Sequence, residues 1–157
     1  MENTEELKEG DIAPGFTAND QNGNTITLSD FKGKDVILYF YPKDDTPGCT
    51  AEACNFRDNY QSLQQKGFTV IGVSTDDEAS HSKFVTKYQL PFSLVSDPDQ
   101  KIVKSYGVWV EKNMYGKKYM GTARTTFIIG KDGKIKNVIR KVDTADSSKQ
   151  VLDLLSN

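Results

Sequence analysis

Two cysteines, Cys49 and Cys54, are the residues whose type and spacing best suit chemistry. They lie in the segment Pro42-Lys-Asp-Asp-Thr-Pro-Gly-Cys49-Thr-Ala-Glu-Ala-Cys54. A thiolate is a strong nucleophile, and two neighbouring thiols can alternate between the reduced state and a disulfide. The segment therefore indicates sulfur-based nucleophilic or redox chemistry.

The position of this segment also favours a site. It follows residues 36–41, an almost continuous apolar and aromatic run that predicts a central strand buried on both faces. A helix is predicted next, from apolar residues that recur at helical spacing: Ala53, Phe56, Tyr60 and Leu63. Sites in open α/β sheets lie beyond the carboxyl ends of strands, where this segment falls.

Cys49 falls in the first turn of the predicted helix. There the unpaired backbone N–H groups and the helix dipole stabilise a thiolate. Thr46 is placed to cap the helix or to donate a hydrogen bond to the sulfur. Pro42 and Pro47 stiffen the loop without adding N–H groups that need partners. Each of these features suits an activated thiol.

Helical geometry separates the two cysteines. Cys49 precedes Ala53 by one helical repeat, so it continues the buried stripe and points toward the sheet. Cys54 lies roughly 140° further round, with its Cα about 8–9 Å from that of Cys49 in an ideal helix. A disulfide needs Cα atoms within about 7 Å. If the cysteines bond, we expect the first turns of the helix to unwind.

Other interpretations of the same residues stay open. Cysteines at this spacing can be buried and inert. A closed zinc site needs four ligands, and Cys49, Cys54 and the single histidine, His81, fall short. We expect His81 to be a partly exposed helix residue. Asp44 and Asp45 are acidic residues of a loop before a helix, and such residues need no metal. Glu52 falls in the first helical turn, where a carboxylate ordinarily complements the helix dipole.

Strand and helix patterns alternate along the rest of the chain. Further strands are predicted at 25–28, 69–74, 125–129 and 134–140, and further helices at 78–88, 100–106 and 145–155. The alternation predicts an α/β fold whose sheet is mostly parallel, with antiparallel strands added by the closing hairpin. Residues 108–121 are expected to form a hairpin or surface loop packed on the core, with a substrate-gathering lip as the alternative.

Composition narrows the class of protein. The 157 residues suit a single domain, 1–157, with a polar tail at 1–9. The net charge of -2 argues against nucleic-acid binding. No apolar run reaches the roughly 20 residues of a membrane span, and the polar tail is unlike a targeting segment. We expect a cytoplasmic protein, in which a cysteine pair is catalytic, redox-active or inert.

The cysteine segment resembles the peroxiredoxins. Pro42-x3-Thr46-x2-Cys49 is similar to their active-site pattern, and Gly48-Cys-Thr-x-Glu52-Ala-Cys54 resembles the bacterioferritin comigratory protein, or Q-type, branch. The resemblance spans nearly the whole chain, through further stretches at 55–58, 90–92, 96–97, 106–108 and 124–127.

This resemblance implies a thioredoxin-like fold, with a central mixed sheet flanked by helices and an N-terminal β-hairpin extension. It also implies reduction of hydrogen peroxide and organic hydroperoxides without a metal or cofactor. Cys49 would be the peroxidatic thiolate and Cys54 the resolving thiol. Thr46 would hydrogen-bond the thiolate and the peroxide, Pro42 would shield the pocket, and Arg124 would lie beside the sulfur. A fixed positive charge there stabilises the thiolate and the departing oxygen.

The implied cycle runs through a sulfenic acid on Cys49 and a disulfide with Cys54, which thioredoxin or a similar dithiol reduces. An intrachain resolving thiol favours a monomer. One alternative is a thiol-disulfide oxidoreductase, although such proteins use Cys-x-x-Cys. Another is a non-enzymatic redox-sensing or chaperone-like protein, for which residues 108–121 are the candidate surface.

Overall fold

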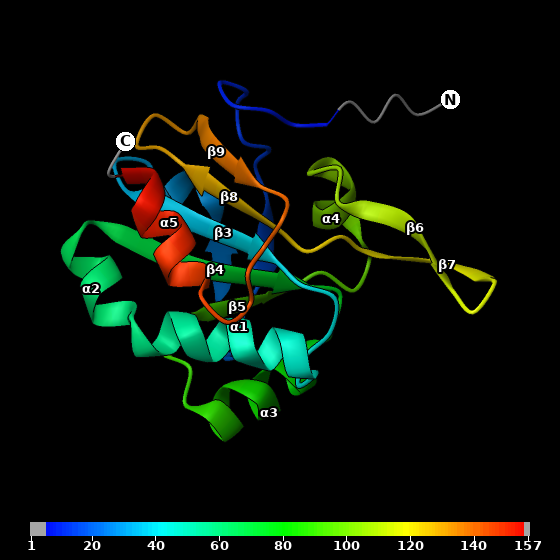
Figure 1. Ribbon diagram of the computed structural model, residues 1–157. Coiled ribbons are helices and arrows are strands. Elements are labelled where there is room, and N and C mark those ends of the chain that lie inside the picture. The colour runs from blue at the N-terminus through cyan, green and yellow to red at the C-terminus, as the bar shows by residue number, and fades with distance from the viewer. Residues whose placement is uncertain (1–5, 156–157) are drawn as a thin grey trace.

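The apolar run identified in the sequence forms the central strand of the sheet. The computed structural model describes residues 6–155, in which β3 (Asp35–Phe40) pairs in parallel with β4 (Phe68–Ser74) and antiparallel with β8 (Thr125–Ile129). β5 (Ser93–Ser96) and β9 (Ile135–Ile139) complete the order β5-β4-β3-β8-β9. The mixed sheet of an α/β fold implied by the resemblance is confirmed (Figure 1). The expectation of a mostly parallel sheet is wrong, because β4 pairs in parallel with β3 and β5, whereas β8 pairs antiparallel with β3 and β9.

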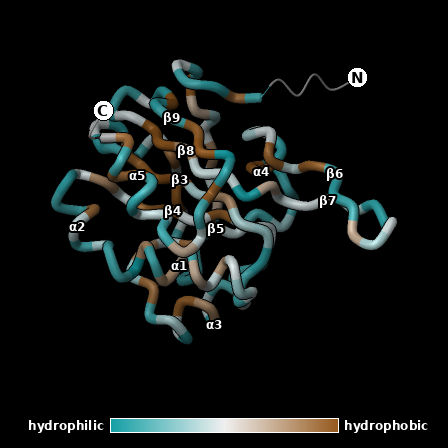
Figure 2. Tube along the Cα trace, in the orientation of Figure 1, coloured by the Kyte–Doolittle hydropathy of each residue, from teal (hydrophilic) through white to brown (hydrophobic). Residues whose placement is uncertain are grey.

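Side chains alternate across β3 and divide the core into two clusters. Val36, Leu38 and Phe40 point to one face, while Ile37 and Tyr39 point to the other. The first face is covered by α4 (Lys101–Ser105) and N-terminal residues, and the second by α1 (Pro47–Asp58), α2 (Tyr60–Gln65), α3 (Glu78–Tyr88) and α5 (Ser147–Leu155). Burial on both faces explains why the central strands are hydrophobic along their length (Figure 2).

The predicted helices are present, with changes at their ends. Helix α3 begins and ends where the sequence predicts. The single stripe from Ala53 to Leu63 is divided at Asn59, where α1 ends and α2 begins. The Asn59 side chain donates to the carbonyl of Asn55 at 2.8 Å, which satisfies one acceptor of the last turn.

The N-terminal strands form a separate sheet. β1 (Thr17–Asn19) pairs antiparallel with β2 (Thr25–Thr27), in agreement with the expected hairpin extension. Leu28, predicted to end that strand, instead begins a short 3-10 helix, η1 (Leu28–Phe31). β5 was not predicted, because a four-residue strand carries too little pattern to be recognised.

Residues 108–121 contain the predicted hairpin, made of β6 (Trp109–Met114) and β7 (Lys117–Thr122). Its packing on the core was wrongly predicted: the hairpin reaches outward from the sheet (Figure 1), and Tyr115 at its tip is 99% exposed. Only its base is attached, through buried Val108 and partly buried Trp109. Among residues 6–155, no helix has the length and apolar character needed to cross a bilayer.

Candidate active site

Cys49 lies in the first turn of α1, as predicted. Thr46 is the N-cap residue, and Pro47 begins the helix with a fixed φ suited to that position. The Cys49 side chain is 1% exposed and belongs to the cluster that includes Tyr39 and Ala53. The sulfur therefore points toward the sheet at a helix terminus that favours negative charge.

Arg124 approaches the same sulfur from a distant part of the chain. Its Nη2 lies 3.2 Å from Sγ of Cys49. Antiparallel pairing of Phe40 with Thr125 brings the start of β8 beside the end of β3, which places Arg124 at the loop before α1. A Cβ on Gly48 would lie 3.1 Å from Nη2, so the glycine leaves room for the guanidinium. The arginine and the helix terminus both stabilise negative charge on the sulfur.

Glu52 forms a buried ion pair with Arg124. It is 0% exposed, and its Oε1 accepts a bond of 3.0 Å from Nη1 of Arg124. Ser147 Oγ lies 3.3 Å from the other carboxylate oxygen. Burial raises the pKa of Glu52 to about 7, against the opposing effects of Arg124 and Ser147. Glu52 was wrongly interpreted as an ordinary dipole partner, because it is buried against the arginine.

The charge of Arg124 is secure despite its partial burial. Burial lowers the pKa of Arg124, but Cys49 and Glu52 outweigh that effect and the pKa is raised. One guanidinium thus bridges the buried carboxylate and the sulfur. The spacing of Glu52, one helical turn after Cys49 on the buried face, was the sequence signal that could have identified it.

Thr46 and Pro42 lie in the loop before α1, and among residues 6–155 the Thr46 hydroxyl makes no hydrogen bond to the sulfur. The Thr46 hydroxyl donates to the carbonyl of Lys43 at 2.9 Å and, within the described chain, does not make the expected capping bond to α1. This bond closes the tight loop in which Asp45 has a positive φ of 57°. Pro42 is half-buried where β3 enters the loop. The structure brings together Cys49 and Arg124, while Thr46 and Pro42 shape the loop beside them.

Cys54 lies in the same helix as Cys49 and is half-buried. Both cysteines are free thiols. With both residues inside α1, the helical spacing holds their Cα atoms about 8–9 Å apart, beyond the range of a disulfide. A bond between them requires α1 to open.

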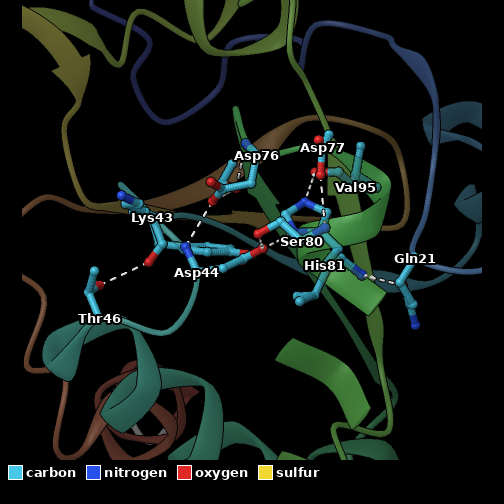
Figure 3. A network of polar contacts seen from close by, with 12 residues as sticks. Gln21, Lys43, Asp44, Thr46, Asp76, Asp77, Ser80, His81 and Val95 are labelled. Carbon is cyan, nitrogen blue, oxygen red and sulfur yellow. Dashed lines mark hydrogen bonds and ion pairs between the residues drawn. The ribbon is translucent and has the colours of Figure 1, made fainter. Parts of the chain in front are cut away.

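A buried polar network lies behind the loop (Figure 3). Asp44 Oδ2 lies 2.6 Å from Nδ1 of His81 and accepts a bond of 2.7 Å from the Ser80 hydroxyl. The expected partial exposure of His81 is wrong: its side chain is 0% exposed. The positions of His81 and Phe84 on one face of α3, spaced like the apolar stripe, were the signal for burial.

Known proteins are similar to this chain over most of its length. A sequence model described as AhpC/TSA family matches residues 10–138. The chain is 44% identical to peroxiredoxin Bcp of Bacillus subtilis, covering 94% of each chain. It is 46% identical to peroxiredoxin Bcp of Escherichia coli, covering 95% of this chain and 96% of the relative.

Solved structures show the same similarity. Xylella fastidiosa PrxQ superposes with a TM-score of 0.90 at 34% identity, over 97% of both chains. The Xanthomonas campestris bacterioferritin comigratory protein, whose alkyl peroxide reduction activity has been studied structurally, gives a TM-score of 0.84 at 36% identity, over 90% of both chains. The stretch matched by the family model, residues 10–138, includes the positions of both cysteines and Arg124.

Proposed function

Because this chain belongs to the AhpC/TSA family and is a thiol-dependent peroxidase of the peroxiredoxin type, we propose that Cys49 is the thiol that a hydroperoxide oxidises. The observation that carries this assignment is the 3.2 Å contact between Sγ of Cys49 and Nη2 of Arg124 at the start of α1. Two independent sources of positive potential thus meet at one sulfur.

The first chemical step transfers one oxygen atom to Cys49. The thiolate attacks the nearer peroxide oxygen, the S–O bond forms and the O–O bond breaks. The departing hydroxide or alkoxide then takes a proton and leaves as water or alcohol. Arg124 stabilises the charge that develops on this oxygen, because its N–H groups are already aimed at the reaction centre. Glu52 holds the guanidinium in that orientation.

Cys54 completes the cycle in our proposal. Its thiol attacks the sulfenic sulfur of Cys49 once α1 has opened, so the disulfide forms and water leaves. A thioredoxin-type dithiol then reduces the disulfide by exchange and is itself oxidised. Pro42 shields the oxidised sulfur from water. Thr46 orients the peroxide when its hydroxyl turns away from the Lys43 carbonyl.

We propose hydrogen peroxide and alkyl hydroperoxides as substrates. The alkyl peroxide activity of the Xanthomonas campestris relative supports the second class. We further propose that the chain acts as a single-domain monomer in the cytoplasm. An intrachain resolving thiol needs no partner subunit, and a reducing compartment keeps both cysteines available between cycles.

The test is stopped-flow fluorescence of reduced protein mixed with hydrogen peroxide, followed by intact mass. Trp109 is the sole tryptophan and serves as the reporter. We expect fast oxidation and a final loss of two hydrogens. Cys49→Ser should be inactive, whereas Cys54→Ser should reduce one equivalent of peroxide and then stop. Sustained thioredoxin-linked turnover by Cys54→Ser would refute the resolving role.

A further inference from the structure

The ring of His81 faces hydrogen-bond acceptors on both sides. Nδ1 lies 2.6 Å from a carboxylate oxygen of Asp44, and Nε2 lies 3.0 Å from the carbonyl oxygen of Val95. A neutral imidazole has a single N–H donor, so it satisfies only one of these contacts unless Asp44 carries a proton. Both contacts are hydrogen bonds only when the pair holds one more proton than a neutral histidine beside a carboxylate.

The Asp44 carboxylate also accepts bonds from two hydroxyl groups. The Tyr41 hydroxyl donates to Oδ1 at 2.6 Å, and the Ser80 hydroxyl donates to Oδ2 at 2.7 Å. Bonds donated to both oxygens favour the ionised carboxylate. Both side chains are buried, with His81 0% and Asp44 4% exposed, so water does not compete for the bond between them.

Asp44, Asp76 and His81 also have possible metal-binding atoms within 4.8 Å of one another. However, Nδ1 of His81 faces Asp44 across 2.6 Å, too short to admit a cation between them. Asp76 instead accepts the backbone N–H of Asp44 at 2.8 Å and the Ser74 hydroxyl at 2.8 Å. The cluster is arranged to hold a proton and the loop backbone.

The pair joins three parts of the fold, one of which is the loop that leads into Cys49. Asp44 lies in the loop between β3 and α1, His81 lies on α3, and Val95 lies in β5. Asp44 is fixed through both its side chain and its backbone N–H (Figure 3). The loop that leads into Cys49 is therefore attached to α3, and through His81 to the edge strand β5, by buried bonds for which water does not compete.

We propose that the Asp44–His81 pair is the anchor of the Cys49 loop, and that it holds residues 42–46 in place while α1 opens downstream of the sulfur. This inference rests on the proposed role of Cys49. His81 acts as a positioning residue through Asp44 and does not touch the peroxide. Opening is then confined to the part of α1 that carries Cys54, and the loop keeps its geometry for the next cycle.

The first test needs no substitution, because His81 is the only histidine of the chain. Nitrogen-15 NMR of the protein labelled at histidine reports whether each ring nitrogen carries a proton. At neutral pH we expect protons on both nitrogens, protected from exchange, in the reduced and in the disulfide form. A spectrum of one neutral tautomer, or loss of the ring N–H signals on oxidation, would overturn the proposal.

The second test compares the bonds that Asp44 makes to α3 with the bonds that Asp45, in the same loop, makes to the same helix. Asp45 makes an exposed tie to α3, with bonds of 2.9 Å to Lys87 and to Tyr88, and Asp45→Asn is the matched control. A displacement of the reacting groups by ~1 Å can slow a reaction on the order of 100-fold. We therefore expect hydrogen peroxide to oxidise Cys49 at least about 10-fold more slowly in His81→Phe and in Asp44→Asn than in the unmodified protein. Asp45→Asn should stay within about twofold.

Circular dichroism and thermal melts establish that each variant is folded before its rate is compared. Folded His81→Phe with the rate of the unmodified protein would overturn the anchor. If the unmodified protein itself consumes no peroxide, the proposed function fails instead, and the NMR result still decides the protonation of the pair. If a variant does not fold, the comparison of the two redox forms by NMR remains decisive.

Discussion

Nη2 of Arg124 lies 3.2 Å from the sulfur of Cys49, although 75 positions separate the two residues. Neither helix α1 nor strand β8 creates this contact alone. It arises because β8 pairs antiparallel with β3, and because the residue before Cys49 is a glycine that leaves space for the guanidinium.

Arg124→Lys should slow the reaction of Cys49 with hydrogen peroxide by roughly 10- to 100-fold, because an ammonium cannot contact Glu52 and the sulfur in the same forked geometry. Arg140→Lys is the matched control, since Arg140 is a partly exposed arginine that bonds the carbonyl of Leu7. Stopped-flow rate constants provide the comparison. Equal losses in both variants would contradict a specific role for Arg124.

Opening of α1 should be visible by hydrogen exchange. In the reduced protein the amides of residues 50–56 are inside the helix and should be protected. In the disulfide form the same amides should exchange faster, because the bond cannot form across an intact helix. Residues 78–88 of α3 serve as the internal reference and should not change. Equal exchange in residues 50–56 of both forms would rule out local unfolding.

Glu52 should make stability depend on pH near neutrality. Burial raises its pKa from 4.5 to about 7, so the folded state binds more protons than the unfolded state between these values. Stability therefore falls as the pH rises through this window, by about 3 kcal/mol at most. Urea unfolding at pH 5 and pH 8 should show this decrease in the unmodified protein and a smaller one in Glu52→Gln. Parallel pH dependences would contradict the burial effect.

Gly72→Ala should destabilise the fold by roughly 1–3 kcal/mol through overpacking. A Cβ at Gly72 would lie 2.8 Å from both Leu94 Cδ2 and Tyr39 Cζ, and both side chains are buried. Gly15→Ala is the control, because a Cβ there meets nothing within 4 Å. The midpoints of urea unfolding provide the measure. Similar midpoints for the two variants would show that Tyr39 can move.

The local pattern of residues predicted the helices and strands around the cysteines. It failed for features that are decided by packing between these elements. Cys49 in the first turn and α3 at 78–88 follow from helical spacing and from turn residues close in sequence. The hairpin at 108–121 was recognised, but its outward direction was not, because direction depends on contacts with the rest of the fold.

The buried polar residues show the same limit. Glutamate usually lies at the surface and histidine is intermediate, so residue type alone did not indicate that Glu52 and His81 are buried. Their burial depends on partners far along the chain, Arg124 and Asp44. The helical position of each residue did indicate burial, since both residues lie on the inward face of their helix.

The sequence by itself determined the sulfur chemistry, the start of the helix that carries Cys49, and the spacing that keeps Cys54 out of reach. These depend on residue type and on helical geometry, which are local. Only the tertiary structure decided that one guanidinium joins Glu52 to Cys49, and that Asp44 lies 2.6 Å from His81 behind the loop. Both require groups distant in sequence to be brought within hydrogen-bonding distance in a dry interior, which is set by strand order and packing.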